Sequence, residues 1–500
     1  MTVLSTSQNP KILHSNAARA DESDALLVIV PPDAGPNVLA RLPEKERWQQ
    51  LNARSPSRSG TVRSTVLANR RQTLAVLGYL RAEASHFERL SLAGRMLKES
   101  APREAETLGL AVQGGTDKAA SLDALLAAAL AHAFALPSFR SHKRDERRIK
   151  SISIIEGDGL DVRYAAAASQ GNNLARWLTA LPPNMLNARS YHRTIAELAK
   201  EHGLTMQWLD EKALKRAGAN AFLAVSAGNA ARTAGIAHLK YRPARRKSGT
   251  APDVALVGKG ILFDTGGINL KPHKSMLDMH IDMAGSAVAL STLIALAQLR
   301  APIAADAWLA ITENEIGPKA YRPQEVVRAS NGVTIQVIHT DAEGRMVLAD
   351  TLALAARTRP RFMIDFATLT GACVYALTER MSGVFTNRPA LTDKLLEAGR
   401  SSGERVWNFP FDSDYDSDLE SKVADVVQCA VDGKGDHILA TRFLSRFVPD
   451  DVAWAHVDLS AAMRSGGLGH VTTDITGFGV RYALDLILKQ KIADGLERPK

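Results

Sequence analysis

The sequence predicts an α/β protein in which a mixed β-sheet is sandwiched between helices. Two observations predict this class. The chain has 500 residues and 45% hydrophobic content, enough to bury large cores in two or three domains. Along its C-terminal part, short apolar runs alternate with helix-length segments, a pattern typical of strands separated by helices.

The N-terminal part contains three recognisable elements. Residues 26–30 and 152–155 are expected to form strands, and the alanine-rich segment 122–136 is expected to form an amphipathic helix. Serine and proline at residues 55–57, among arginines, predict an exposed loop.

The elements of the C-terminal part follow one another along the chain. Because sites in such sheets gather beyond the carboxyl ends of the strands, Asp264, Asp341 and Thr368 are expected to lie there together. Strands are predicted at residues 254–257, 307–311, 362–366 and 453–459, and helices at 284–299, at 346–356 and from residue 480.

Cysteine usage and the N-terminus indicate the cellular setting. Cys373 and Cys429 form neither a C-x-x-C pair nor a disulfide framework, which favours a reducing cytoplasm. Residues 1–19 lack the apolar core of a signal peptide. No stretch approaches the ~18 uninterrupted apolar residues of a membrane span. We therefore expect a soluble cytoplasmic protein.

The segment HTDAEGR at residues 339–345 places two acids and an arginine at alternate positions before an apolar helix. In an extended stretch, residues two apart point to the same side, so Asp341, Glu343 and Arg345 would converge. Two acids beside an arginine indicate a site for a hard cation together with an anion clamp. The alternative is a helix N-cap with a solvated charge cluster.

A second charged cluster lies in the glycine-rich, apolar stretch 254–283. Lys259, Asp264, Lys271 and Asp282 stand there among residues that otherwise resemble a core. Charged groups are rarely buried without partners, so these side chains should pair or hold metal. A phosphate-binding loop is the competing interpretation, but the stretch contains neither G-x-x-x-x-G-K-[ST] nor G-x-G-x-x-G at a strand end.

Together these motifs resemble the leucyl aminopeptidase family, the two-metal cytosol aminopeptidases. The resemblance covers roughly residues 170–490, with every motif in the family's order. It is carried by VGKGILFDTGGINLKP (257–272), MHIDMAGSA (279–287), HTDAEGRMVLAD (339–350), DFATLTGAC (365–373), PPN (182–184) and TGFGVR (476–481).

The resemblance assigns a role to each charged residue. It implies that two divalent metal ions, Zn²⁺ or Mn²⁺, are held by five ligands, with Asp264 and Glu343 bridging. Lys271 matches the catalytic lysine, and Arg345 matches the residue that holds a bicarbonate. The five matched ligands are Lys259, Asp264, Asp282, Asp341 and Glu343.

Lys259 must bind metal as a neutral amine, which burial and nearby cations would favour. The alternative for Lys259 is an ordinary ion pair with Asp264 or Asp282.

This inventory suits the hydrolysis of a peptide bond. Two metals lower the pKa of a shared water near neutral pH, and aminopeptidases are known examples of such sites. A metal-bound α-amine would limit cleavage to the first residue of a peptide with a free N-terminus. The cation of Lys271 would stabilise the negative charge that develops on the carbonyl oxygen.

The pocket for the first side chain is expected to prefer leucine or methionine, because methionines provide a pliable apolar wall. Three features depart from the family: His339 replaces the usual asparagine, Ser460 replaces an alanine, and residues 433–438 form an unfamiliar loop. The expected pocket residues are Met279, His339, Thr368, Leu369, Gly371, Ser460 and Met463.

The resemblance also implies an organisation and an assembly. A smaller N-terminal α/β domain would span residues 1–165, a linking helix 166–185, and a larger catalytic α/β domain 186–500. Members of the family assemble as hexamers, so a homohexamer is expected.

Other functions remain open. Basic runs account for much of the +9 formal charge and suggest DNA binding as a regulatory side activity, although the chain has no DNA-reading motif and only 5% aromatic residues. A dipeptidase with another residue preference is a further alternative. A non-catalytic relative is not favoured, because every matched position carries a ligating side chain. The basic residues are Arg54, Arg58, Arg63, Arg70, Arg71, Arg81, Lys143, Arg144, Arg147, Arg148 and Lys150.

Overall fold

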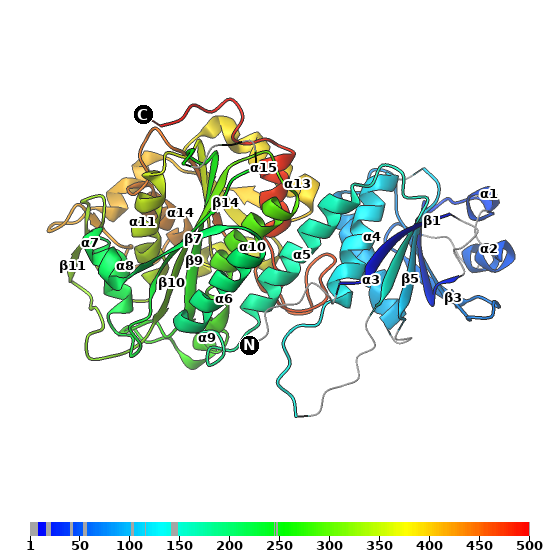
Figure 1. The fold of residues 1–500 in the computed structure, drawn as a ribbon, viewed down its shortest axis with the longest axis horizontal. Helices are drawn as coiled ribbons and strands as arrows, with labels where there is room; N and C mark the ends of the chain where they lie inside the picture. Colours follow the sequence, from blue (N-terminus) through cyan, green and yellow to red (C-terminus); the bar gives the residue numbers. More distant parts are fainter. Residues whose placement is uncertain are drawn as a thin grey trace.

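The computed structural model describes residues 9–16, 22–40, 44–53, 58–101, 105–115, 117–141, 149–244, 246 and 249–499. Two sheets stand side by side with helix α5 (Val162–Thr179) between them (Figure 1). This is the predicted α/β class. The loop at residues 55–57 and the basic residues Arg54, Lys143, Arg144, Arg147 and Arg148 lie outside the described residues.

The N-terminal sheet has the strand order β1-β6-β5-β2-β4-β3 and is parallel except for the pair β3–β4. Alternate residues of β2 enter two separate cores, one built with α3 and α4 and one with Trp48 of α2. Every residue of β2 is therefore buried. The strands are β1 (Lys11–Ser15), β2 (Ala25–Val30), β3 (Val62–Val66), β4 (Leu74–Tyr79), β5 (Thr107–Val112) and β6 (Ser151–Ile155); the helices are α1 (Pro36–Leu39), α2 (Lys45–Ala53), α3 (His86–Ser100) and α4 (Lys118–Ala133).

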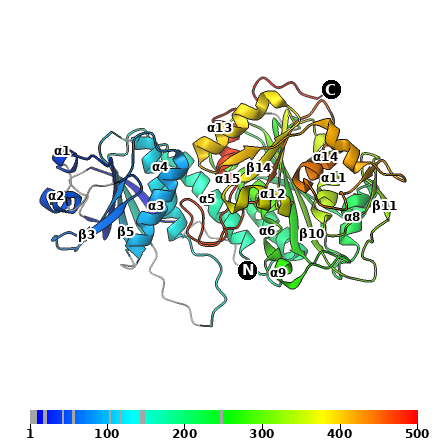
Figure 2. The same cartoon turned by 180° about the vertical axis from the view of Figure 1, so that it is seen from behind.

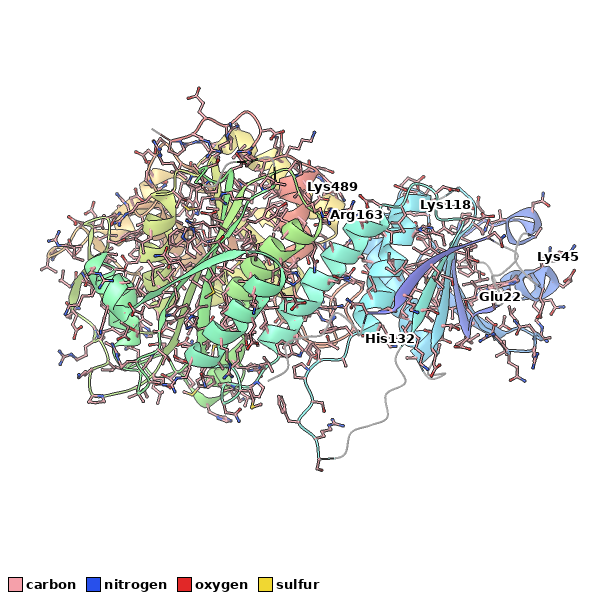
Figure 3. All side chains as sticks on the ribbon, in the orientation of Figure 1. Glu22, Lys45, Lys118, His132, Arg163 and Lys489 are labelled. Atoms are coloured by element: carbon pink, nitrogen blue, oxygen red, sulfur yellow. The ribbon has the colours of Figure 1, made fainter. Side chains whose placement is uncertain are left out.

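Helix α5 connects the two sheets. It begins at Val162 because the side chain of Asp161 caps it, and it ends at Thr179, shortly before Pro182. On its first turn, next to Arg163, the ring of Tyr164 lies 4.6 Å from the Nζ of Lys489, which follows α15 (Val480–Leu488); Figure 3 labels Arg163 and Lys489. Further along, the Asn172 amide donates to the carbonyls of Thr476 and Gly477, which ties α5 to the turn before α15.

The larger sheet has the order β15-β14-β17-β13-β9-β10-β8-β7. Its centre is parallel, whereas β8 pairs antiparallel with β10 and β7, and β14 with β17. Strand β9 extends beyond the predicted 254–257 because β10 pairs with it along its length. The strands are β7 (Thr205–Asp210), β8 (Gly235–Tyr241), β9 (Val254–Asp264), β10 (Ala305–Asn314), β13 (Phe362–Ala367), β14 (Ser382–Thr386), β15 (Val406–Asn408) and β17 (Ala453–Asp458).

Helices cover both faces of this sheet (Figures 1 and 2). Val254 and Leu256 of β9 pack with α5, α6, α10, α13 and α15, whereas Ala255 and Val257 pack with α8, α11 and α14. Burial on both faces explains why β9 is continuously apolar at its start. These helices are α6 (Ala188–Glu201), α8 (Asn220–Ser226), α10 (Ala284–Gln298), α11 (Glu343–Ala356), α13 (Thr392–Ser402) and α14 (Asp436–Ser445); α7 (Glu211–Arg216) lies beside α8.

Helix α10 packs unusually close to the sheet. A Cβ on Gly258 would lie 2.5 Å from Ser286 Cα, and a Cβ on Gly285 would lie 2.0 Å from the Phe366 carbonyl oxygen. Only glycine permits these contacts, which hold the start of α10 against β9 and β13 next to Lys259. The helical stretch His273–Gln298 is long and apolar enough to cross a membrane, but 83% of the relevant window is buried inside the protein.

Shorter elements complete the half of the molecule that contains the larger sheet. In a three-stranded sheet, β12 pairs parallel with β16, which places Gln428 beside the segment that precedes α11. The remaining elements are β11 (Val326–Arg328), β12 (Thr334–Gln336), β16 (Val426–Val427), α9 (His273–Met276), α12 (Gly371–Leu377), and the 3₁₀ helices η4 (Met279–Ile281), η5 (Thr378–Arg380), η6 (Pro389–Leu391) and η7 (Ser413–Leu419).

Candidate functional site

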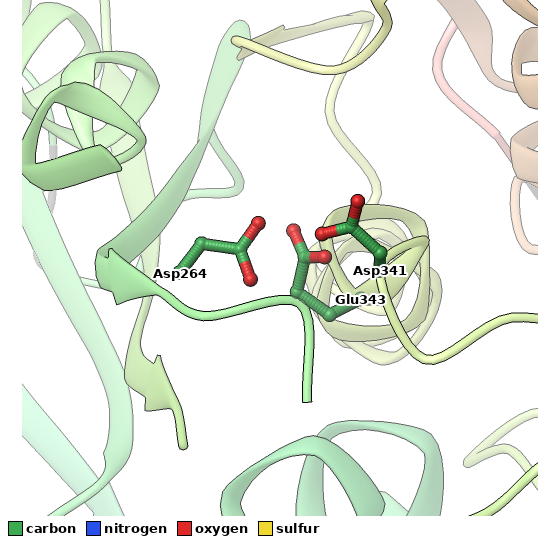
Figure 4. A group of neighbouring side chains, drawn as sticks. All are labelled: Asp264, Asp341 and Glu343. Carbon is green, nitrogen blue, oxygen red and sulfur yellow. The ribbon is translucent and has the colours of Figure 1, made fainter. Parts of the chain in front are cut away.

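Three carboxylates meet at the carboxyl end of β9. Asp264 is the last residue of β9, Asp341 lies in the turn before α11, and Glu343 is the first residue of α11. One oxygen from each lies within 4.8 Å of the other two, and the side chains face one another (Figure 4). Partly buried acids at this separation repel one another unless cations lie among them.

The convergence of Asp341 and Glu343 has a different origin from the predicted one. Residues 340–341 form a turn, and α11 starts at Glu343, so the segment is not extended. The prediction of an extended segment was wrong, because the helix begins immediately after the turn. Thr368 does follow β13 as expected, whereas Asp341 follows no strand of the large sheet.

The alternative of a solvated helix cap is also wrong. No side chain caps α11 at Ala342, and both Glu343 and Arg345 are buried. The charges at this helix start are therefore held inside the protein.

Lys259 joins the cluster from β9. Its Nζ lies 2.8 Å from Asp282 Oδ2 and 2.9 Å from Glu343 Oε1, and it donates to the Thr368 carbonyl at 2.9 Å. Burial lowers the pKa of Lys259, but the charges of Asp282 and Glu343 raise it more, so the side chain is an ammonium ion in the metal-free protein. This matches the ion-pair alternative, and metal coordination by this nitrogen requires loss of its proton.

Lys271 bridges the remaining two acids. Its Nζ lies 2.9 Å from Asp264 Oδ2 and 2.5 Å from Asp341 Oδ1. The structure thus brings the five predicted metal ligands and Lys271 into one continuous cluster.

The acids of the cluster bind protons more tightly than isolated carboxyls. Burial and the charges of Asp264 and Glu343 raise the pKa of Asp341 to about 7, although Lys271 opposes the shift. Burial also raises the pKa of Asp282 and of Glu343. Protons and metal ions therefore compete for the same oxygens.

The donor set fits divalent cations. The four acids of the cluster face only two ammonium groups, which leaves negative charge to be neutralised. Glu343 Oε2 is buried and has no hydrogen-bond or ion-pair partner among the described residues. Oxygen donors with an unsatisfied lone pair suit hard divalent ions such as Mn²⁺, and also Zn²⁺.

Two glycines make the close packing of the centre possible. A Cβ on Gly344 would lie 2.5 Å from Lys259 Nζ, so only glycine lets the start of α11 lie against that side chain. Gly266 has a φ of +86°, and a Cβ there would lie 2.5 Å from the Asn269 carbonyl. The turn after Asp264 therefore also depends on glycine.

Behind the centre lies a network of uncharged residues that were not identified from the sequence. The Asn314 amide donates to Asp264 Oδ1 at 2.8 Å and to the Thr340 carbonyl at 3.1 Å. The Tyr321 hydroxyl donates to the same carbonyl, and Asn269 Oδ1 accepts from the Thr340 backbone NH. Asn314 ends the strand next to β9, so a polar residue after an apolar strand was the available signal.

Gln428 is a second residue of the site that was not identified from the sequence. It is fully buried, its Oε1 accepts from the backbone NH groups of Ile338 and His339, and its Nε2 donates to the Ala342 carbonyl. It thereby holds the turn that carries Asp341. Its sequence neighbours give no hint of this, because the contact spans 86 residues.

Arg345 forms an ion pair with a carboxylate side chain of the protein. Its Nη2 donates to Asp436 Oδ2 at 2.7 Å, and its Nη1 donates to the Gln428 carbonyl at 3.2 Å. Only Nε, which is buried, lacks a hydrogen-bond partner among the described residues. Asp436, the first residue of α14, belongs to the segment 433–438 that departs from the family, and its carboxylate pairs with the guanidinium for which an external anion was expected.

The expected pocket residues have varied environments. Thr368 Oγ1 donates to Asp282 Oδ1 at 2.8 Å, and the Leu369 backbone NH donates to Asp458 Oδ1. Ser460 Oγ donates to the Met381 carbonyl, so its hydroxyl is already satisfied. Met279 and Met463 are half-buried, and Gly371 is exposed.

The imidazole of His339, which stands where the family has asparagine, is hydrogen-bonded to the backbone. Its Nδ1 accepts from the Asp341 backbone NH at 3.3 Å. Burial and the charges of Lys271 and Arg345 lower its pKa. The imidazole is therefore neutral at pH 7, because its ordinary pKa already lies below 7.

The N-terminal basic residues are partly neutralised by acids. Within the described part of the chain, Arg71 lies 3.4 Å from Asp24 and Arg81 lies 2.6 Å from Glu88. Lys150 likewise pairs with Glu106 at 2.8 Å. Such pairs reduce the positive field available to DNA, and the DNA hypothesis stays a prediction.

Comparisons with known proteins agree on one family. Residues 173–484 match the sequence profile described as "Cytosol aminopeptidase family, catalytic domain". A probable cytosol aminopeptidase of Syntrophotalea carbinolica is 41% identical over 337 residues, which cover 67% of this chain and 66% of that protein. One of Synechococcus sp. (strain CC9605) is 36% identical over 85% of this chain and 88% of the relative.

A solved structure has the same fold. It is the bottromycin maturation enzyme BotP in complex with Mn, which superposes with a TM-score of 0.82 and 29% sequence identity. The match covers 94% of this chain and 100% of that one.

Proposed function

This chain belongs to the cytosol aminopeptidase family and is an aminopeptidase, and we propose that it removes the N-terminal residue of short peptides with the help of two divalent cations. The observation that carries the proposal is the six-residue cluster at the end of β9. Its four acids have more negative charge than Lys259 and Lys271 can neutralise.

We propose that the two cations are held as the resemblance implies. One would be held by Asp264, Asp341 and Glu343, the three acids whose oxygens lie within 4.8 Å of one another. The other would be held by Lys259 and Asp282, sharing Asp264 and Glu343. Metals bound there would polarise a peptide carbonyl and lower the pKa of a shared water.

The protein side chains then have separate tasks. Lys259 must release its proton on metal binding, and the cations that replace that proton favour the neutral amine. Where metals engage Asp264 and Asp341, Lys271 would be released from these two carboxylates and could face the substrate carbonyl oxygen. Its charge would be most stabilising when that oxygen becomes negative, so it would act mainly on the transition state.

Bicarbonate at Arg345 fits this structure poorly. Asp436 already neutralises the buried guanidinium, and the Gln428 carbonyl accepts a hydrogen bond from its other terminal nitrogen. A bicarbonate acting as the counter-ion of Arg345 would have to displace Asp436 from its 2.7 Å contact. No step of the proposed reaction is therefore assigned to bicarbonate.

We propose a preference for leucine or methionine at the first position. Met279 and Met463, both half-buried, support an adaptable apolar wall. The hydroxyl of Ser460 is turned to the Met381 carbonyl and so adds little polarity. A dipeptidase with another preference remains the alternative, and a panel of dipeptides separates the two.

We further propose a cytoplasmic homohexamer. Large apolar side chains are about half exposed or more on loops at the carboxyl end of the sheet, as expected for a surface that contacts another subunit. They are Ile268, Leu270, Leu277 and Ile316.

The test is release of leucine from leucinamide by purified protein loaded with Mn²⁺ or Zn²⁺. Asp341→Ala and Glu343→Ala should abolish turnover while circular dichroism stays unchanged. Asp414→Ala, which removes an exposed acid far along the chain, is the matched control and should keep activity. N-acetylated leucinamide should not be cleaved. Near-normal activity of either variant with metal, or cleavage of the blocked substrate, would contradict the proposal.

A further inference from the structure

A cavity of about 330 Å³ lies between the two halves of the molecule. On one side it is lined by α3 of the N-terminal sheet, and on the other by residues of the catalytic half near η5, β15 and the loop 464–472. None of the residues of the metal cluster lines it.

The lining of this cavity is strongly basic. Arg95 and Lys98 project from α3, and Arg380, Arg405 and Arg464 come from the catalytic half. No acidic residue is among the lining residues. None of the five cations forms an ion pair with an acid in the part of the chain that the structure describes, in contrast to Arg345 with Asp436.

Arg405 is the most constrained of the five. Its guanidinium stacks on the ring of Phe87 at 3.8 Å, and its Nη2 donates to the Arg380 carbonyl. Its Nε is buried without a hydrogen-bond partner among the described residues. Burial and the charge of Arg380 lower the pKa of Arg405, as expected where neighbouring cations are not neutralised.

The opposite wall is held rigidly in place. Arg464 Nη1 donates to the Gly467 carbonyl, and a Cβ on Gly467 would lie 2.1 Å from the Val471 carbonyl oxygen. A Cβ on Gly94 would lie 2.7 Å from the Gly469 carbonyl oxygen, so α3 and this loop touch at backbone distance. The cations thus stand on surfaces whose separation is fixed by glycine contacts.

We propose that this cavity binds a small molecule carrying two or more phosphate groups. Guanidinium groups bind phosphate oxygens through paired N–H donors, and five cations need an anion of more than one charge. The volume lies in the range of ligand pockets. Because both halves of the molecule contribute cations, the ligand stabilises their contact. The site is independent of the proposed peptide hydrolysis.

The probe is fructose 1,6-bisphosphate, with fructose 6-phosphate and inorganic phosphate as ligands of lower charge. Binding to the full-length, metal-loaded protein is measured by isothermal titration calorimetry, and the melting temperature is measured in parallel. The bisphosphate should bind at least tenfold more tightly than the monophosphate and should raise the melting temperature.

The variant Arg95→Gln/Lys98→Gln removes two exposed cations from α3 and should weaken bisphosphate binding at least tenfold with little effect on folding. Arg193→Gln/Lys200→Gln makes the same charge change on the exposed face of α6 and should leave binding unchanged. Because three cavity cations remain in the first variant, Arg405→Gln is a second test and should weaken binding further.

Three outcomes would overturn the proposal. They are no bisphosphate binding at low salt, equal weakening by the α6 variant, and binding of a 20-base-pair DNA duplex without bisphosphate binding. The last outcome would indicate an extended basic surface rather than a closed site. Leucinamide hydrolysis, measured alongside, reports separately on the aminopeptidase reaction.

Discussion

Replacing Gly344 by alanine should damage the proposed metal centre without replacing any of the proposed ligands. The new Cβ would lie 2.5, 2.6 and 2.8 Å from Nζ, Cε and Cδ of Lys259, about 1 Å closer than normal van der Waals contact allows. Lys259 cannot retreat with its strand, because β9 is paired with β10 and β13 and lies against Gly285. Its side chain must therefore leave its place between Asp282 and Glu343.

The expected magnitude follows from two opposing effects. Overpacking of a dense interior costs about 1–3 kcal/mol. Alanine instead of glycine in a helix returns at most about 1 kcal/mol, and less in the first turn. The free energy of unfolding should fall by roughly 1–2 kcal/mol, which lowers the melting temperature by a few degrees. Loss of one nitrogen ligand should weaken binding of one of the two metals at least tenfold.

The assay combines metal stoichiometry after desalting, by mass spectrometry, with leucinamide hydrolysis. Gly344→Ala should retain one tightly bound metal per chain and lose most of kcat. Gly35→Ala is the control, because Gly35 has negative φ and no atoms within 4 Å of an added Cβ. If Gly344→Ala kept two metals at normal affinity with normal turnover, the inferred position of Lys259 in the centre would be wrong.

Other predictions concern the surroundings of the centre. Asp436→Asn leaves the buried guanidinium of Arg345 without its counter-charge, so the free energy of unfolding measured by differential scanning calorimetry should fall by up to about 3 kcal/mol. Added bicarbonate should restore part of this stability in the variant but should not stabilise the wild type. Asn314→Ala removes a donor to Asp264 and should weaken metal binding about 10–100-fold by competitive chelation, whereas Asn331→Ala, at a part of the chain away from the cluster, should not. Because the pKa of Asp341 is raised to about 7 in the metal-free protein, metal binding below pH 7 releases the proton of Asp341 as well as that of Lys259, so metal affinity should rise more steeply with pH below about 7 than above it; a flat profile from pH 5 to 8 would contradict this. Burial raises the pKa of Glu404 from 4.5 to about 7, so the folded state binds this proton more tightly than the unfolded state. The stabilisation that this proton gives the folded state is fully present below pH 4.5 and is lost as the pH rises to about 7, a change of roughly 3 kcal/mol at most. The melting temperature of Glu404→Gln relative to that of the wild type should therefore rise between these two pH values.

The local sequence pattern was enough to predict the α/β class and most of the central strands and helices. The predicted helix 284–299 corresponds to α10, and the predicted strand 362–366 lies within β13. Such segments are recognisable because burial on both faces makes them continuously apolar. The predicted ends of the helices and strands were less accurate. Helix α11 starts at Glu343 rather than at the apolar residue Met346, because a backbone turn, not hydrophobicity, sets that boundary.

The chemistry of the centre was also present in the sequence, since charged residues in apolar surroundings must find partners. Lys259, Lys271 and their acids were identified in this way, together with the family resemblance. Only the tertiary structure decided which residues that are distant in the sequence contact one another. Asp436 lies 91 positions from Arg345, yet its carboxylate fills the guanidinium edge. The phosphate-site proposal likewise depends on α3 meeting a loop more than 360 residues away. A pattern of residues determines local conformation and burial, but contacts between distant segments arise only when the packed elements bring them together.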